Sequence, residues 1–189
     1  TYNGEVDDVE PCTDKKTIIV LGSGTYRIGS SVEFDYCSVK CMHTLRELGY
    51  HTVMINYNPE TISTDFDESD KLYFEELTFE KVADIYEKEK AYGIIVSMGG
   101  QEPNNIALKL HEYGINVLGI SPESIDNCED RFKFSSLLDE LSINQPAWIT
   151  ANNKDDINNF IEKCKYPVIV RPSYVLSGAA MRIIYNDES

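Results

Sequence analysis

The stretch TIIVLGSGTYRIGSSVE, residues 17–33, decides how the chain begins to fold. An apolar run, Thr17–Leu21, predicts a buried strand, a glycine-rich turn follows it, and a helical pattern begins at Glu33. The turn has the glycine content of a phosphate-binding loop but matches neither common motif. Arg27 stands at the third glycine of the dinucleotide motif G-x-G-x-x-G, and Ser30 stands at the lysine of the P-loop. We therefore predict a loop with the backbone of a nucleotide site and a different use.

The alternation of strand and helix continues along the chain and predicts an α/β fold with a parallel sheet flanked by helices. Further strands are expected at 51–58, 93–100 and 116–120, with helices at 33–48, 78–90 and 104–113. Ligands of such sheets bind at the carboxyl ends of the strands. Four loops are expected at those ends, and they carry most of the Gly, Pro and Asn of the chain: 22–31, 56–63, 97–105 and 119–126.

Individual residues predict how these helices begin, end and pack. Thr78 is suited to cap the helix that follows it, and Gly49 and Gly114 are suited to end helices. For the helix at 33–48 we expect an inward face made of Phe34, Cys37, Cys41, Leu45 and Leu48.

After residue 126 the pattern changes, which predicts a second domain that begins near Cys128 and is cut off at Ser189. An amphipathic helix is expected at 129–141, and a second helix at 154–164. Two strands within 166–185 are joined by a small-residue turn, and a hairpin this apolar needs further partners. The residues expected to face inward from the first of these helices are Phe134, Leu137, Leu138 and Leu141.

Composition excludes several classes of partner. The formal net charge is −15, whereas nucleic acids and anionic membranes require a basic surface, so we expect neither as a partner. The five cysteines form no C-x-x-C pair, which is typical of reduced thiols inside a cell and does not favour zinc. No apolar run reaches the ~20 residues of a membrane span, and the polar, acidic residues 1–15 indicate a linker and no signal peptide.

Five stretches, in this order, carry a family resemblance. Together they resemble the large, synthetase component of carbamoyl phosphate synthetase, in particular the second of its two homologous halves and the eukaryotic type. The resemblance covers the chain from Lys15 onward. The stretches are GSGTYRIGSSVEFDYCSV (22–39), NYNPETISTDFD (56–67), SMGGQEPNNIA (97–107), GISPESIDNCEDRFKF (119–134) and PVIVRPSYVLSGAAM (167–181).

The resemblance implies both a fold and an activity. In that family the first half makes carbamate from bicarbonate, ammonia and ATP, and the second half phosphorylates carbamate with another ATP. The chain would then hold a linker at 1–15, a Rossmann-like pre-ATP-grasp domain at 16–127 and the truncated start of an ATP-grasp domain at 128–189. We expect an ATP-dependent ligase of which this fragment alone is inactive.

By resemblance, Arg27, Glu33 and Glu60 line the passage that brings carbamate to the second active site. An arginine can bind a carboxylate with two hydrogen bonds, and a closed route protects an unstable anion from water. The glutamates would have to be paired with Arg27, protonated by burial, or engaged with neutral carbamic acid. Simpler roles remain open, because Glu33 suits the first turn of a helix and Glu60 can cap a turn.

By the same resemblance, Arg131, Arg171 and Gly178 contact ATP, Gly178 within the flap that closes over the phosphates. Arg171 follows an apolar strand expected to be buried, and a buried arginine requires an anionic partner. Arg131 also suits a solvated position on its helix. The cofactors implied are ATP and Mg²⁺, with the magnesium ligands expected beyond Ser189.

The partners implied are the remainder of the synthetase polypeptide, a glutaminase domain or subunit that supplies ammonia, and carbamate as a small molecule. The cytosol is the expected location, with a mitochondrial, urea-linked relative as the alternative. Three other interpretations remain. One is a different ATP-grasp ligase of the biotin-carboxylase type, and another is a non-catalytic module derived from the fold. The third, an NAD-binding domain, is weakened by Arg27 and by Asn56, which stands where an acidic residue would end the strand.

Overall fold

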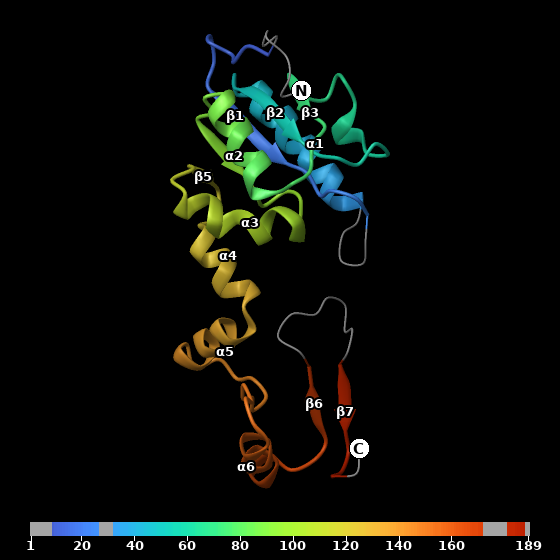
Figure 1. Ribbon diagram of the computed structural model, residues 1–189, viewed down its shortest axis with the longest axis vertical. Coiled ribbons are helices and arrows are strands. Elements are labelled where there is room, and N and C mark those ends of the chain that lie inside the picture. The colour runs from blue at the N-terminus through green and yellow to red at the C-terminus, as the bar shows by residue number, and fades with distance from the viewer. Residues whose placement is uncertain (1–8, 27–31, 172–180, 188–189) are drawn as a thin grey trace. The chain divides into compact units, whose positions relative to one another are not determined.

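The computed structural model describes residues 9–26, 32–171 and 181–187, and Figure 1 shows how its elements follow one another. The chain divides into two compact units, Thr1–Ile125 and Asp126–Ser189. The first unit holds a five-stranded sheet with helices between the strands, as the sequence predicts.

The sheet of the first unit is parallel throughout. Its spatial order is β3-β2-β1-β4-β5, so the first strand of the sequence lies at the centre. Residues of β1 alternate between two cores, because successive side chains of a strand point to opposite faces. The strands are β1 (Thr17–Leu21), β2 (His51–Ile55), β3 (Lys71–Tyr73), β4 (Gly93–Ile95) and β5 (Val117–Leu118).

Helices cover both faces of this sheet. One buried cluster joins Ile18 and Val20 of β1 to Met42 of helix α1, and the other joins Ile19 and Leu21 to α2 and α3. This two-sided burial explains why β1 is a continuous apolar run and does not alternate with polar residues. The helices of the unit are α1 (Val32–Glu47), α2 (Phe79–Lys88), α3 (Gln101–Glu112) and α4 (Pro122–Glu129), with a single 3₁₀ turn, η1 (Ile62–Thr64).

The predicted helix signals at Thr78, Gly49 and Gly114 are confirmed. The Thr78 hydroxyl accepts a hydrogen bond from the Lys81 N–H at the start of α2. Gly49 and Gly114 have φ values of 86° and 97° just after α1 and α3, a region that side chains disfavour.

The predicted inward face of α1 was wrong in part. Leu48 is 68% exposed and Cys37 is exposed, whereas Leu45 is buried as expected. The buried face includes two polar residues, Asp35 and Ser38, which an apolar pattern cannot identify. The full set of buried residues on the helix is Asp35, Ser38, Val39, Met42 and Leu45.

Several element boundaries also differ from the prediction. The strands β2 and β4 end at Ile55 and Ile95, several residues earlier than their apolar patterns suggested. Helix α3 begins at Gln101, and α4 occupies part of a stretch expected to be a loop. Pro122 explains the second case, because its missing N–H is tolerated at the first position of a helix.

The second unit holds two helices and a hairpin. These are α5 (Arg131–Glu140), α6 (Lys154–Cys164) and the antiparallel strands β6 (Val168–Val170) and β7 (Arg182–Ile184). Neither helix has a buried residue. The prediction that Phe134 and Leu141 face inward is therefore wrong for this unit, because these residues are 41% and 60% exposed. The faces of the two helices would need packing partners other than the described part of the unit.

Across the part of the chain that the structure describes, no helix combines the length and apolarity needed to cross a membrane.

Candidate functional site

The candidate site lies at the carboxyl ends of β1, β2 and β4. In a sheet ordered β3-β2-β1-β4-β5 all strands run in the same direction, but β2 and β3 are added on one side of β1, whereas β4 and β5 are added on the other. Folds of this kind bind ligands at the switch point between β1 and β4, where the strand order reverses. The β1–α1 loop begins at Gly22, the β2–η1 loop covers residues 56–61, and the β4–α3 loop covers 96–100.

The β1–α1 and β4–α3 loops touch backbone to backbone. A Cβ atom added to Gly99 would lie 2.1 Å from the Gly22 carbonyl oxygen, so only glycine fits there. At Gly22 itself an added Cβ would lie 2.4 Å from the side chain of Asn56. These glycines therefore allow the β1–α1 loop to pack against the β4–α3 loop and against Asn56. Gly22 and Gly99 leave no space between them for a ligand.

Asn56 links the β1–α1 loop to the β2–η1 loop. Its side chain is fully buried at the end of β2, and its Oδ1 accepts hydrogen bonds from the N–H groups of Gly24 and Tyr57, both at 3.0 Å. Its Nδ2 donates to the Ser63 Oγ at 3.0 Å, so both halves of the amide are satisfied. The Gly24 N–H, which a nucleotide-binding loop would present to phosphate, is directed to the protein.

Asp35 holds the other side of the β2–η1 loop. It lies in the first turns of α1 with 5% of its surface exposed. Its carboxylate accepts the N–H of Ile62 at 2.9 Å and the N–H of Ser63 at 3.3 Å. Hydrogen bonds to a carboxylate are stronger than neutral ones, so α1 and η1 are firmly joined.

The predicted passage residues that can be located lie at this same end of the sheet. Glu33 is exposed in the first turn of α1, two residues before Asp35. Glu60 is exposed in the β2–η1 loop, where its N–H donates to the Asn58 Oδ1 at 3.1 Å. The contacts of Asp35 bring their two segments together. Arg27 lies outside the described residues.

Tyr26 lies beside the same loops, and the sequence analysis did not identify it as a candidate. Burial raises the pKa of its phenol, and the nearby carboxylates of Asp35 and Glu60 raise this pKa further. Tyr26 is 43% exposed, so it lies at the surface. Its position in a glycine-rich loop was a signal, but one shared by many structural aromatic residues.

The hydroxyl of Ser23, in the β1–α1 loop, is a second group at this end of the sheet that the sequence analysis did not identify. Its side chain is fully buried, and its Oγ has no hydrogen-bond partner among the described residues. Buried polar atoms are nearly always paired, so this oxygen remains available to a water molecule or a small polar ligand.

The predicted ATP residues lie in the second unit. Arg131 is the first residue of α5, after Asp130, whose side chain caps the helix by accepting the Lys133 N–H at 2.9 Å. Arg171 follows β6 and is exposed, as are Ile169 and Val170 before it. The expectation of a buried strand, and of a buried charge that needs an anion, is therefore wrong for this unit. Gly178 lies outside the described residues.

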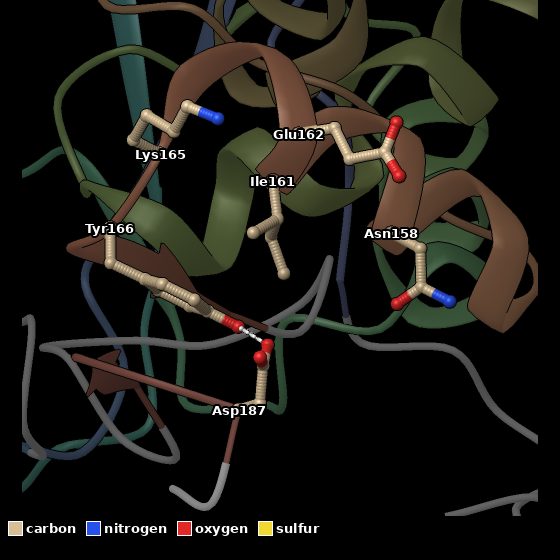
Figure 2. A pocket seen from close by; sticks show the side chains of 6 residues that line it. All are labelled: Asn158, Ile161, Glu162, Lys165, Tyr166 and Asp187. Atoms are coloured by element: carbon tan, nitrogen blue, oxygen red, sulfur yellow. Dashed lines mark hydrogen bonds between the residues drawn. The ribbon is translucent and has the colours of Figure 1, made fainter.

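The second unit also has an open groove beside the end of α6, shown in Figure 2. The Tyr166 hydroxyl donates to the Asp187 Oδ1 at 2.5 Å across it, and this hydrogen bond raises the pKa of Tyr166. None of the residues predicted to bind ATP lines the groove. Its lining consists of Asn158, Ile161, Glu162, Lys165, Tyr166 and Asp187.

Among the described residues, no group of three or more His, Cys, Asp or Glu side chains is arranged to hold a metal ion.

Two family models match the chain. Residues 14–127 match the carbamoyl phosphate synthase preATP-grasp domain, and residues 130–189 match the carbamoyl-phosphate synthase L chain, ATP binding domain.

Curated relatives are similar over nearly the whole chain. The arginine-specific large chain of carbamoyl phosphate synthase from Eremothecium gossypii is 58% identical over 100% of the chain, which covers 17% of that relative. The multifunctional protein CAD of Squalus acanthias is 56% identical over 99% of the chain, which covers 8% of it. A mitochondrial arginine-specific large chain from Schizosaccharomyces pombe is 56% identical over 100% of the chain. The chain thus spans less than a fifth of these relatives, 8–17% of their length.

Solved structures share the fold at low sequence identity. The biotin carboxylase domain of 2-oxoglutarate carboxylase from Hydrogenobacter thermophilus has a TM-score of 0.63 and 21% identity, over 92% of this chain and 38% of that one. N5-carboxyaminoimidazole synthetase from Staphylococcus aureus has a TM-score of 0.63 and 16% identity, over 95% and 44% of the two chains.

Proposed function

The chain belongs to the carbamoyl phosphate synthase large-chain family, and from this premise we propose that it is part of the second half of such a synthetase, which phosphorylates carbamate with ATP. The first unit would contribute loops that line the carbamate passage, and the second would begin the domain that binds ATP. Relatives more than 50% identical are carbamoyl phosphate synthase large chains or proteins that contain this region, which favours this family over the biotin-carboxylase type.

The main observation behind the proposal is that the Gly24 N–H donates its hydrogen bond to a protein side chain and is not free to bind phosphate. In a nucleotide-binding loop of this fold, backbone N–H groups at the switch point face phosphate. Here the Gly24 N–H donates to Asn56 at 3.0 Å and the Gly22 N–H donates to the Ile55 carbonyl at 2.9 Å. The loop therefore suits a role other than nucleotide binding, and ATP is assigned to the second unit.

The residues at this end of the sheet suit a small, polar substrate. Glu33 and Glu60 present carboxylates, Tyr26 presents a phenol whose pKa is raised, and the Ser23 hydroxyl is buried without a partner among the described residues. These groups can donate or accept single hydrogen bonds to carbamate or carbamic acid as it passes. A passage enclosed by such groups would keep bulk water away from an unstable intermediate.

ATP and Mg²⁺ would act in the second unit and in the polypeptide that adjoins it in the synthetase. Arg131 and Arg171 would bind phosphate oxygens, and their positive charges would stabilise the transferring phosphoryl group. The flap that contains Gly178 would bring backbone N–H groups to the phosphates. One solved structure of the same fold, the biotin carboxylase domain of 2-oxoglutarate carboxylase from Hydrogenobacter thermophilus, contains MgADP, which supports the proposal of the same cofactors here.

We also propose the partners that this role requires. The remainder of the synthetase polypeptide would pack against the chain, and a glutaminase domain or subunit would supply ammonia. We also propose the cytosol as the location, with the mitochondrion as the alternative, because one relative is named as a mitochondrial large chain.

The direct test is the reverse partial reaction in the full-length synthetase that carries this chain. We expect it to form ATP from ADP and carbamoyl phosphate in the presence of Mg²⁺. Arg171→Ala should reduce this rate by about 100-fold or more, because it removes a group that stabilises the transferring charge. Arg182→Ala is the matched control, since Arg182 pairs with Val170 in the same hairpin and should change the rate by less than about twofold.

A protein that binds nucleotide and is folded but forms no ATP from carbamoyl phosphate would contradict the assignment. Equal losses in the two arginine variants would contradict the role given to Arg171 and leave the family assignment intact.

A further inference from the structure

We propose that Asn56 and Asp35, here called the loop clasp, are positioning residues that fix the walls of the carbamate passage without touching carbamate. The proposal rests on the proposed function of the β1–α1 and β2–η1 loops. It concerns two buried side chains that no motif comparison singled out as site residues.

Asn56 is the first half of the loop clasp. It stands at the end of β2, where a dinucleotide-binding fold places an acidic residue for the ribose, but its fully buried amide faces the protein. Its oxygen accepts the N–H groups of Gly24 and Tyr57, so one atom joins the β1–α1 loop to the β2–η1 loop. Its nitrogen donates to Ser63 in η1, just after the second loop. The position that dinucleotide-binding folds use for a ligand contact is therefore used here to hold two loops together.

Asp35 is the second half of the loop clasp. Asp35 is 5% exposed, and its carboxylate accepts the N–H groups of Ile62 and Ser63. Burial of a carboxylate is costly, and backbone donors offset that cost only while η1 stays in this position. The first turn of α1, which carries Glu33, is thereby held against the segment that follows Glu60.

The two halves meet at Ser63, whose N–H is bound by Asp35 and whose hydroxyl is bound by Asn56. Further hydrogen bonds fix the backbone between Asn56 and Ser63. The hydroxyls of Thr61 and Thr64 donate to the Asn58 carbonyl at 2.8 and 2.9 Å. Glu60 is thus an exposed side chain on a backbone fixed on both sides. A change in the loop clasp would move Glu60 and Tyr26 relative to one another while leaving the ATP site in the second unit chemically intact.

The test compares two activities of the full-length synthetase. Overall synthesis from bicarbonate needs carbamate to travel from the first active site to the second, whereas ATP formation from ADP and carbamoyl phosphate needs the second site alone. The variants are Asp35→Asn and Asn56→Asp, which keep the side-chain shape and change one hydrogen-bonding group. The matched control is Asp70→Asn, because Asp70 also binds a backbone N–H, that of Thr52 at 2.8 Å, but near the start of β2.

For both variants of the loop clasp we expect overall synthesis to fall by about 10- to 100-fold, the range that a misplaced group costs. ADP formed per carbamoyl phosphate should rise, because carbamate escapes before it is phosphorylated. ATP formation from carbamoyl phosphate should stay within about twofold of the parent enzyme, and Asp70→Asn should leave both activities and their ratio unchanged.

Parallel losses of both activities, with the ADP ratio unchanged, would overturn the proposal, because they would show a general structural role. Unchanged activities would overturn it as well. If Asn56→Asp fails to fold, Asp35→Asn alone decides, since its amide retains one accepting oxygen for the Ile62 N–H. Failure of the parent enzyme to form ATP from carbamoyl phosphate would instead contradict the proposed function, whatever the variants do.

Discussion

At the scale of single residues, the carboxyl end of the sheet is organised by groups that bind backbone. Asn56 and Asp35 accept four different backbone N–H groups between them, from Gly24, Tyr57, Ile62 and Ser63. A buried polar side chain is stabilising only when its partners are present, so these contacts favour one loop arrangement over all others. The geometry of this end is therefore specified by individual atoms more than by apolar packing.

Gly99 offers a direct test of how closely the loops approach. An added methyl group would lie 2.1 Å from the Gly22 oxygen, and rigid backbone cannot yield as a side chain can. We expect Gly99→Ala to lower the free energy of unfolding by about 3 kcal/mol, the upper part of the usual range for overpacking. Urea denaturation monitored by circular dichroism measures this.

Gly114→Ala is the control for that substitution. Gly114 has a φ of 97° and nothing within 4 Å of an added Cβ, so only backbone strain of about 1 kcal/mol is expected. If both variants lost the same stability, the close contact between the loops would not be the cause.

We expect Asp70 to make the stability of the first unit depend on pH. Burial alone would raise the pKa of this carboxyl, but hydrogen bonds from Thr52 and the charges of His51 and Arg46 together hold the pKa below its ordinary value. A lowered pKa contributes stability that is fully present above the unfolded value, about 3.9, and is lost as pH falls through the folded value. The parent protein should therefore exceed Asp70→Asn in stability at pH 7, and the difference should shrink below about pH 4.

The measurement is a series of urea unfolding curves for both proteins between neutral and acidic pH. A difference that stayed constant, or that grew on acidification, would show that the Asp70 carboxylate does not act through its charge.

At the scale of elements, the sequence correctly predicted those strands, helix caps and helix ends that depend on neighbouring residues. The apolar run 17–21, the cap at Thr78 and the glycines that end α1 and α3 all act within a few residues, and each is confirmed. The buried face of α1 was missed because Asp35 and Ser38 are buried for contacts with distant parts of the chain. The same reason hides the loop clasp, since Asn56 and Ser63 are recognisable as partners only once the loop is folded.

Thr78 provides the element-scale prediction. Its hydroxyl satisfies an N–H at the start of α2 that has no acceptor within the helix. Thr78→Ala should destabilise the first unit by about 1 kcal/mol, and Thr78→Ser should retain most of that stability because serine is an equal or better cap. Thermal unfolding of the three proteins checks this, and a serine variant as unstable as the alanine variant would exclude capping as the cause.

At the scale of the whole molecule, the two units differ in how much they bury. The first has apolar clusters on both faces of its sheet, whereas α5 and α6 of the second bury no residue and Ile169, Ile183 and Tyr185 are more than half exposed. The chain spans 8–17% of its relatives, and those relatives have further polypeptide of the kind that would cover such side chains. The exposed faces of the second unit could not be predicted from an amphipathic pattern. Such a pattern indicates that one face of a helix is buried, but it does not identify the part of the protein that covers this face.

This difference predicts how the units behave when they are produced separately. Residues 9–125 should unfold in one cooperative transition and give a well-dispersed amide spectrum, because they contain their own core. Residues 126–189 should give a poorly dispersed spectrum and no sharp transition, because too little apolar surface is buried to offset the loss of chain entropy. The check is NMR and calorimetry on both pieces, and a sharp transition in 126–189 alone would contradict it.

The central position of β1 also governs the order in which the first unit can form during translation. β1 leaves the ribosome first, and β2 can pair with it soon afterwards, but its other neighbour, β4, begins only at Gly93. Until β4 is synthesised, one edge of β1 remains unpaired. During this period a nascent parallel sheet is most susceptible to chaperone binding and to misassembly. Synonymous codons that slow the ribosome between β2 and β4 would lengthen this period, so the yield of folded protein should respond to codon choice there even though the amino-acid sequence is unchanged.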